Sequence, residues 1–471
     1  MNSKYKFLLS NTGLFFISTF SSKFLVFLLM PIYTSVLSPD QFNTVDLMTQ
    51  TANLLIPLVS LGVPNSIIRF GLDKNYSKRG VFTIAALTYL AGFMVLLAFY
   101  PVIVKITFIG QYVRYLYLYL LCSCARTLVQ QFVRARTLTR LYAVDGILAT
   151  VNTLFFVYLY LIKFQMGAMG YILATITADF VSFLFLSVVS GCWKYFSLKK
   201  AKSALATEML TYCLPLIPTS IFWWITNVSD HYLVTAIVGA SAGGIYAISY
   251  KIPSIVNLVS TVFTEAWQIS AVKEGQEQHP EKFFTTVFKA YQGVMFMGGA
   301  GLILICRVLV DFMVASEYYE SWRFIPVLIL ATIFSSFSGF LSSIYMVQKD
   351  GKSNLFTMMA GALSNIGMNL ILIPKWGAQG AAVATFISYL LVFVLRANGT
   401  KKFININISP VFMLTNVVLI GLLAFVMVNE IRFWLVVSIA LTIAIIAFNF
   451  IPLFTFVKSL VKSLLGKKRK A

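Results

Sequence analysis

The sequence is poor in charged residues, and poorest in acidic ones. Aspartate and glutamate together number 16 in 471 residues, there are 2 histidines, and all charged residues amount to 11%, whereas roughly a quarter of the residues in soluble domains are charged. Hydrophobic residues make up 59%. A chain this long and this apolar cannot enclose its hydrophobic side chains in one water-soluble core, so the composition predicts a protein solvated by lipid.

Sequence motifs of ATP hydrolysis and metal binding are also absent. The chain has no GxxxxGK[ST] phosphate loop, and its 2 histidines and 5 cysteines show no metal-ligand spacing. Its loops reach about 16 residues at most, which is too short for a soluble catalytic domain. We therefore expect a transporter rather than an enzyme, with no metal or cofactor. H⁺, Na⁺ and the membrane potential remain as candidate energy sources.

Apolar segments, by contrast, are abundant. A transmembrane helix needs about 20 predominantly apolar residues, and segments of about that length follow one another almost without interruption. The pattern predicts an all-α polytopic membrane protein with about 14 transmembrane helices. The predicted spans are residues 7–36, 42–70, 80–105, 112–133, 142–162, 168–192, 208–238, 244–272, 283–310, 324–347, 354–374, 378–395, 408–428 and 433–456.

The lysines and arginines of the loops, together with Lys105 and Arg114 at the ends of spans, lie mainly in alternate segments. With the N-terminus placed in the cytoplasm, 25 fall in segments on that side and 6 on the opposite side. Cytoplasmic loops of membrane proteins carry this excess of positive charge. The distribution predicts that both termini are cytoplasmic and that the chain lies in a cytoplasmic (inner) membrane. It also accounts for the net charge of +21 without a nucleic-acid partner.

A nine-residue motif occurs twice in the chain. Gly167–Thr175 reads GAMGYILAT and Gly377–Thr385 reads GAQGAAVAT, with five identical residues at an interval of 210. Both copies open a span from the same side of the membrane, so the repeat is parallel, and duplicated lobes around a cleft are typical of transporters. We predict two six-helix lobes, two additional transmembrane helices and a basic cytoplasmic tail. Their limits are 1–200, 201–402, 403–456 and 457–471.

Ionisable side chains inside the predicted spans mark the candidate functional site. A charge at the centre of a membrane helix costs about 2.5–3.5 kcal/mol on insertion scales, so it faces the bundle interior or an aqueous cavity. Asp145 lies towards the cytoplasmic end of its span, where we expect it to be solvated. The candidate cavity residues are Lys23, Asp46, Gln50, Arg126, Asp179, Asn227, Asp230, His231, Lys251 and Glu265.

Structural ion pairing is an alternative role for some of these charges. Arg126 and Asp179 have similar depths in one predicted lobe, and Asp230 and Lys251 have similar depths in the other. Each pair can therefore be neutralised internally instead of contacting a substrate. His231 is suited either to packing or to proton transfer.

Two stretches of the sequence resemble a known family. The first comprises Leu37–Phe42 (LSPDQF), Leu61–Val63 and Arg69–Phe70, and the second comprises Ser229–Tyr232 (SDHY), Gly239, Gly244, Tyr246 and Tyr250–Pro253 (YKIP). Both resemble bacterial polysaccharide exporters of the multidrug/oligosaccharidyl-lipid/polysaccharide exporter superfamily, which often have arginine where this chain has His231.

The resemblance covers nearly the whole chain and implies a flippase that works by alternating access. Its substrate would be an undecaprenyl-pyrophosphate-linked oligosaccharide repeat unit, as in lipopolysaccharide O-antigen or capsule, moved from the inner to the outer leaflet. The resemblance also implies cavity cations, which here fall on Lys23 and Lys251. The expected partners are the lipid-linked oligosaccharide, membrane lipids, a polysaccharide polymerase and glycosyltransferases.

The same superfamily leaves two other substrates open. The lipid II flippase has two additional C-terminal helices that form a lipid groove, and the predicted helices in 403–456 resemble them. A cation-coupled drug exporter is the second alternative, but it would favour an acidic cavity and twelve spans. Lys23, Lys251 and the count of fourteen weigh against that alternative.

Overall fold

The computed structural model describes residues 27, 29–73, 75–105, 110–274, 280–348 and 350–468. Within these ranges the chain consists of helices, turns and short loops, and no β-strand is present. Two compact units, Met1–Trp224 and Ile225–Ala471, meet in sequence inside helix α10 (Leu216–Ile237). The all-α polytopic fold class expected from the sequence is confirmed. The lobe limits remain a prediction.

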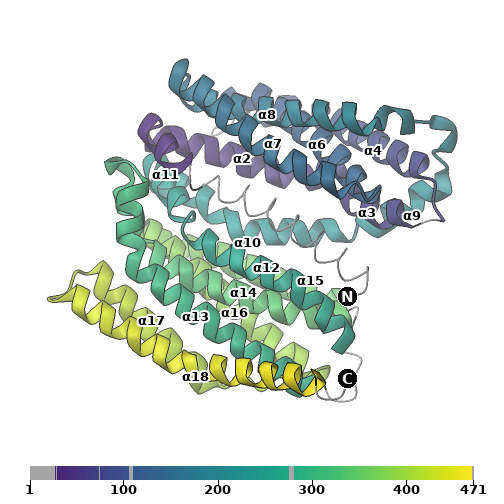
Figure 1. Cartoon of the computed structure of the whole chain (residues 1–471). Helices are drawn as coiled ribbons and strands as arrows, with labels where there is room; N and C mark the ends of the chain where they lie inside the picture. Colours follow the sequence, from purple (N-terminus) through teal and green to yellow (C-terminus); the bar gives the residue numbers. More distant parts are fainter. Residues whose placement is uncertain are drawn as a thin grey trace. The chain divides into compact units, whose positions relative to one another are not determined.

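The first unit contains the helices up to this boundary. They are α2 (Pro39–Ser60), α3 (Val63–Leu72), α4 (Lys78–Ala98), α5 (Tyr100–Ile103), α6 (Val113–Ala135), α7 (Thr139–Val157), α8 (Gly167–Ser190), α9 (Ser203–Cys213) and the beginning of α10. In Figure 1, α6, α7 and α8 run side by side, and α8 packs against both of the others. This packing brings polar residues of three helices to one place.

The second unit is built around a central helix. Its helices are the rest of α10, α11 (Ala240–Ser249), α12 (Pro253–Glu274), α13 (Pro280–Met313), α14 (Ile325–Val347), α15 (Gly351–Trp376), α16 (Ala378–Gly399), α17 (Pro410–Val428) and α18 (Trp434–Lys468). The apolar segment of α14 is 78% buried, the largest share of any candidate span in the described residues. Phe334, Phe337 and Phe340 of α14 are buried among aromatic side chains of neighbouring helices.

The first glycine of the duplicated GAxG motif has a positive φ angle in both units. Gly167 and Gly377 have φ angles of +56° and +58°, a left-handed conformation that favours glycine. A Cβ at Gly170 would lie 2.9 Å from the carbonyl oxygen of Tyr160, and one at Gly380 would lie 2.3 Å from that of Leu372. Each copy therefore reverses the chain and lets a helix approach its predecessor closely, as small residues do in membrane bundles.

The number of spans expected from the sequence is neither met nor contradicted. Nine helices in the described part of the chain are long and apolar enough to cross a membrane, or ten if the bent pair α2–α3 is one span. Two shorter apolar helices cover Pro253–Thr264 and Trp434–Phe450. The first expected span, 7–36, lies mostly outside the described residues. The count of fourteen stays a prediction.

Two expected spans are interrupted rather than continuous. Helices α2 and α3 meet at an angle of 51°, and both Leu61 and Gly62 between them have left-handed φ angles. Helix α11 ends at Ser249, and α12 begins at Pro253 after three residues of turn. Proline lacks the N–H that would continue the helical hydrogen bonds. Hydrophobicity alone did not reveal these breaks, which place Tyr250 and Lys251 outside regular helix.

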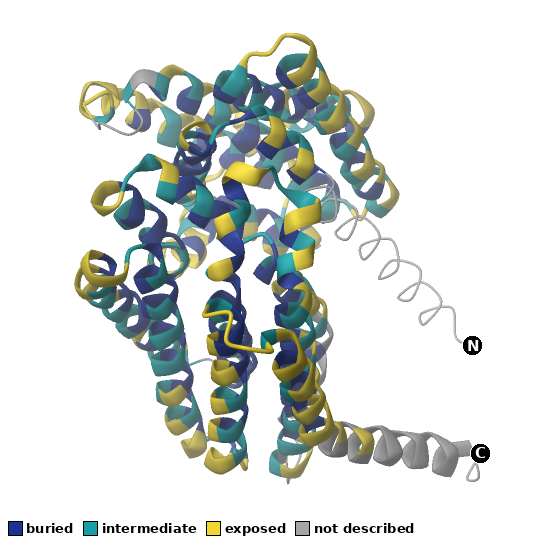
Figure 2. Cartoon of the chain, turned by 90° about the vertical axis from the view of Figure 1, so that its left-hand side faces the viewer, coloured by how far each residue is buried: buried dark blue, intermediate teal, exposed yellow. Residues whose placement is uncertain are grey.

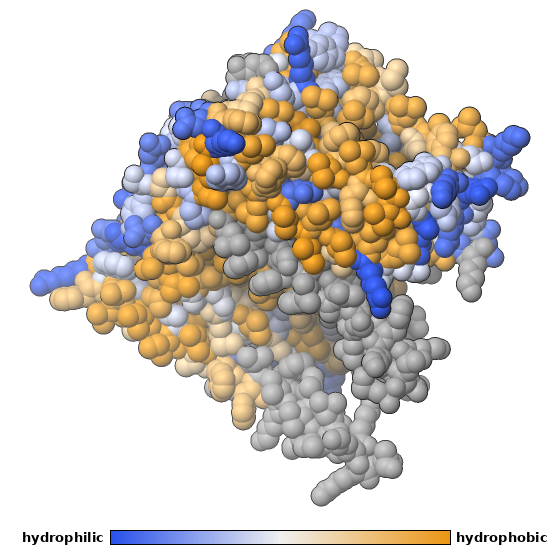
Figure 3. Space-filling view, turned by 45° about the horizontal axis from the view of Figure 1, so that its top comes forward, coloured by the Kyte–Doolittle hydropathy of each residue, from blue (hydrophilic) through white to orange (hydrophobic). Residues whose placement is uncertain are grey.

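Apolar side chains are exposed over much of the surface. Figure 2 shows exposed residues along the lengths of the helices, and Figure 3 shows broad areas of hydrophobic side chains with hydrophilic ones gathered elsewhere. Phe312, Val308 and Val188 are 84%, 69% and 64% exposed. Patches of this extent exceed those of soluble monomers and fit helices that face lipid.

Candidate functional site

A group of charged and polar side chains lies between α6, α7 and α8 of the first unit. Arg126 Nη1 is 2.6 Å from Asp179 Oδ1, and Arg126 Nη2 is 3.4 Å from Asp145 Oδ2. Gln130 Nε2 donates to Asp145 Oδ2 at 3.2 Å, and the Ser123 hydroxyl donates to the other oxygen of Asp179. The structure thus forms the Arg126–Asp179 pair that the sequence offered as an alternative.

The position of Asp145 differs from the expectation. Its side chain is fully buried rather than solvated. The reason is helix rotation: Asp145 faces α6, where Arg126 and Gln130 offset the cost of removing a carboxylate from water. Arg126 keeps 22% of its side chain exposed.

We expect Arg126→Ala to destabilise the protein, because it would leave two carboxylates without their cation. Removing one partner of a buried ion pair costs about 3–5 kcal/mol. Thermal unfolding of the purified variant in detergent measures the loss, with Arg140→Ala, at an exposed position, as the control. A structural pair predicts that adding Asp179→Ala restores part of the stability. Wild-type melting of Arg126→Ala with loss of transport would instead assign Arg126 to substrate binding.

Polar residues also form a stripe along α2. Gln50 Nε2 donates to Asp46 Oδ1, and Asn53 Nδ2 donates to Gln50 Oε1, each at 3.4 Å. Trp224 Nε1 donates to the backbone carbonyl of Gln50 at 2.8 Å. Asp46, Gln50 and Asn53 lie three or four positions apart, so they share one face of α2.

The second unit holds a fully buried carboxylate, Asp230 of α10. Its Oδ2 accepts hydrogen bonds from the hydroxyls of Tyr246, at 2.8 Å, of Tyr250, and of Thr385, at 3.0 Å. The Nε2 atom of His231 lies 4.0 Å from Oδ1. The hydroxyl donors offset the desolvation of the carboxylate and come from α11, the α11–α12 turn and α16.

The hydrogen bonds around Asp230 form a network, and polar side chains of α15 extend it. Asn365 Oδ1 accepts hydrogen bonds from Ser229, at 2.8 Å, and from Asn369, at 2.9 Å. Asn365 Nδ2 donates to Thr385 Oγ1 at 3.3 Å. The network therefore links α10, α15 and α16 through side chains that are all, except Ser229, fully or almost fully buried.

Sequence reasoning did not assign these partners to the site. Tyr246 and Tyr250 occur in the stretch that carries the family resemblance, and Thr385 ends the second copy of the repeat. The resemblance and the repeat therefore pointed to the segments that contain these three partners. Asn227 was among the candidates, and it accepts a hydrogen bond from Tyr389 at 2.5 Å. Asn365 could not have been found from its own helix alone.

The remaining candidates are only partly described. Lys251 lies in the turn between α11 and α12 and is half-buried. Lys23 lies outside the described residues, and so does the side chain of Glu265. The described candidates fall into two sets, with Asp46, Gln50, Arg126 and Asp179 in the first unit and Asn227, Asp230, His231 and Lys251 in the second.

Solved structures with a similar fold include a flippase and a multidrug transporter. A structure described as lipid II flippase MurJ in an inward closed conformation covers 96% of this chain and 100% of its own, with a TM-score of 0.70 and 13% identity. An inward-facing multidrug resistance MATE family transporter of the MOP superfamily covers 82% of this chain and 94% of its own, with a TM-score of 0.64 and 13% identity. The chain therefore shares its fold with these two structures.

The chain belongs to the polysaccharide biosynthesis protein family, whose sequence profile matches residues 8–268, more than half of its length. The resemblance noted from the sequence is thereby confirmed. An uncharacterized membrane protein of Methanocaldococcus jannaschii is 24% identical over 196 residues, which span 40% of this chain and 44% of that relative. This match covers less than half of the relative's length and assigns no activity.

Proposed function

We propose that this protein is a flippase for lipid-linked oligosaccharides. Membership of the polysaccharide biosynthesis family carries the proposal, because the match extends across the first unit and into α12. The substrate would be an undecaprenyl-pyrophosphate-linked repeat unit of a surface polysaccharide. It would move from the inner to the outer leaflet of the bacterial cytoplasmic membrane, with both termini of the protein in the cytoplasm.

The distribution of charged side chains supports a substrate with an anionic group. A pyrophosphate cannot enter an apolar bundle unpaired, because burying an isolated charge is prohibitively costly. Lys251, half-buried at a helix break, is the described candidate for pairing with it, and Lys23 is a second candidate. Irregular backbone inside membrane transporters lines cavities, and broken helices are typical of their substrate sites.

The buried carboxylates are suited to couple substrate movement to a change in their own charge. Asp230 is held by three hydroxyl donors from α11, the α11–α12 turn and α16, so a change in its charge would alter contacts among all three segments. We propose that Asp46, Gln50, Arg126 and Asp179 in the first unit, and Asn227, Asp230, His231, Lys251 and Glu265 in the second, line or support the transport pathway. Glycosyltransferases would act before the flippase, and a polysaccharide polymerase would act after it.

Lipid II is the second candidate substrate. The lipid II flippase structure covers 96% of this chain, whereas the multidrug transporter covers 82%. The larger coverage favours a lipid-linked substrate over a small drug, and it is compatible with either glycan.

The proposal is tested in vesicles containing the purified full-length chain. We expect fluorescent undecaprenyl-pyrophosphate-linked oligosaccharide to cross between leaflets at a rate well above that of protein-free vesicles. Lipid II and a cationic dye serve as competing substrates in the same vesicles. Faster transfer of lipid II would assign the protein to peptidoglycan synthesis, and dye transport without lipid transfer would contradict the flippase proposal.

A further inference from the structure

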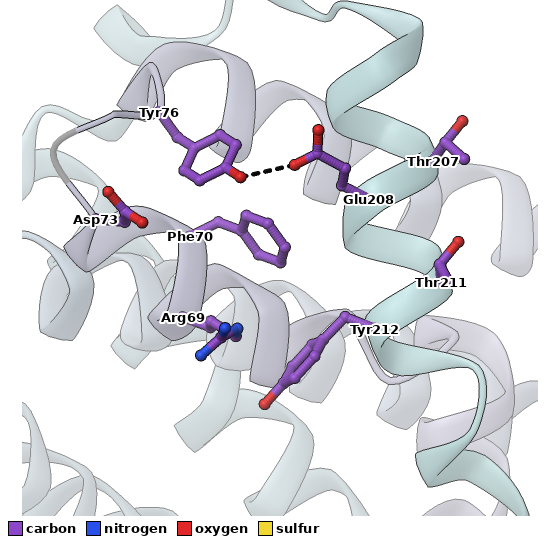
Figure 4. Close-up of a pocket in the computed structure, with 8 residues that line it drawn as sticks. All are labelled: Arg69, Phe70, Asp73, Tyr76, Thr207, Glu208, Thr211 and Tyr212. Carbon is purple, nitrogen blue, oxygen red and sulfur yellow. Dashed lines mark hydrogen bonds between the residues drawn. The ribbon is translucent and has the colours of Figure 1, made fainter.

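A groove lies between the end of α3 and helix α9 in the first unit. Its volume is about 520 Å³. Figure 4 shows its lining side chains, which come from two segments, 69–76 and 207–212, with 130 residues between them. They are Arg69, Phe70, Asp73, Tyr76, Thr207, Glu208, Thr211 and Tyr212.

Aromatic rings and one hydrogen bond organise the groove. The Tyr76 hydroxyl donates to Glu208 Oε2 at 2.7 Å, which raises the pKa of Tyr76 because the neighbouring carboxylate opposes ionisation. The ring of Phe70 meets those of Tyr76 and Tyr212 edge-on, with centroids 5.0 and 6.1 Å apart. The Arg69 guanidinium lies 5.3 Å from the centroid of the Tyr212 ring. The groove thus brings a cation and a carboxylate together around three rings.

The charges of the lining select among ligands. Asp73 and Glu208 are acidic and Arg69 is basic, so the lining has both signs and a formal excess of one negative charge. Such a lining disfavours a ligand that is purely anionic. Aromatic faces attract ammonium groups, carboxylates pair with them, and a guanidinium binds phosphate in a bidentate manner. A phosphate joined to an ammonium group therefore matches the chemistry of these side chains.

The chain around the groove indicates an amphiphilic ligand. Leu72, next to Asp73, is 52% exposed, and Leu214, two residues after Tyr212, is 48% exposed. Arg69 and Tyr212 lie at ends of expected membrane spans, where tyrosine and basic residues are enriched at the lipid–water interface. A water-soluble ligand would gain nothing from exposed leucines beside its site, whereas the acyl chains of a lipid would.

We propose that this groove binds the phosphoethanolamine headgroup of a membrane phospholipid. Arg69 pairs with the phosphate, and Glu208 and Asp73 pair with the ammonium group beside the rings of Phe70 and Tyr212. The site lies outside the candidate transport residues and does not depend on the flippase proposal. It makes the fold responsive to the zwitterionic lipid content of the membrane.

Thermal unfolding of the purified full-length protein in detergent tests the site. We expect short-chain phosphatidylethanolamine to raise the Tm of the wild-type protein by several degrees, through preferential binding to the folded state. Phosphatidylglycerol with the same acyl chains should give a much smaller shift. Equal shifts with both lipids would overturn the proposal. An equal shift with free phosphoethanolamine would overturn the assignment to a lipid.

Two variants separate binding from folding. Glu208→Gln removes the charge but keeps an oxygen that accepts the Tyr76 hydrogen bond, so the variant should fold and bind phosphatidylethanolamine at least about tenfold more weakly. Arg69→Gln should show the same loss. Arg79→Gln, at an exposed position outside the lining, should respond as the wild type does. An undiminished response of Glu208→Gln and Arg69→Gln would contradict the proposal.

Discussion

We expect Lys251→Ala to abolish transport of the lipid-linked substrate while the protein still inserts and accumulates normally. Lys251 follows Tyr250, which binds Asp230, and lies in the turn before Pro253, where no regular helix confines its side chain. An unpaired buried charge costs about 3–5 kcal/mol, and each 1.36 kcal/mol is a factor of ten in rate. Loss of the cation facing a pyrophosphate therefore predicts at least a hundredfold slower transfer.

The measurement is the rate of leaflet transfer in vesicles, normalised to the amount of folded protein. Lys352→Ala, at an exposed position of the same unit, is the matched control and should transfer substrate at the wild-type rate. Wild-type transfer by Lys251→Ala would remove Lys251 from the pathway. If Asp230→Ala/Lys251→Ala folds better than either single variant, the two residues form a structural pair.

The second large effect concerns Lys23 and the source of energy. We expect Lys23→Gln to lose transfer without loss of protein, and Lys23→Arg to retain it, because we propose that a positive charge within the expected span 7–36 carries the pyrophosphate. One elementary charge moving through 100 mV is worth about 2.3 kcal/mol. That energy biases two conformations by about fiftyfold, and the negative cell interior favours outward movement of an anionic substrate.

Energised vesicles with and without an uncoupler separate these two claims. Wild-type transfer should slow when the potential collapses, and Lys23→Gln should be inactive in both conditions. Equal wild-type rates with and without the uncoupler would show that the membrane potential does not drive transfer. Full activity of Lys23→Gln would show that the charge at this position is dispensable.

Local patterns of the sequence predicted much of the fold. Apolar segments of membrane-spanning length indicated an all-α polytopic chain, because lipid leaves backbone groups no partner other than their own helix. The repeated GAxG motif indicated two equivalent turns, and Gly167 and Gly377 have nearly the same φ angle. The stripe of Asp46, Gln50 and Asn53 followed from helical spacing alone. In each case the residues concerned are close together in the sequence.

Only the tertiary structure decided which distant side chains meet. Arg396 directly follows the expected span 378–395 and is one of the 25 basic residues assigned to the cytoplasmic side. In the structure it is buried and donates to Thr357, to the carbonyl of Ser338 and to Asn354. Thr385 reaches Asp230 across 155 positions. Contacts of this kind depend on the rotation of each helix about its axis and on its depth beside its neighbours. Neither quantity is encoded in the periodicity of a single helix, because packing between helices sets both.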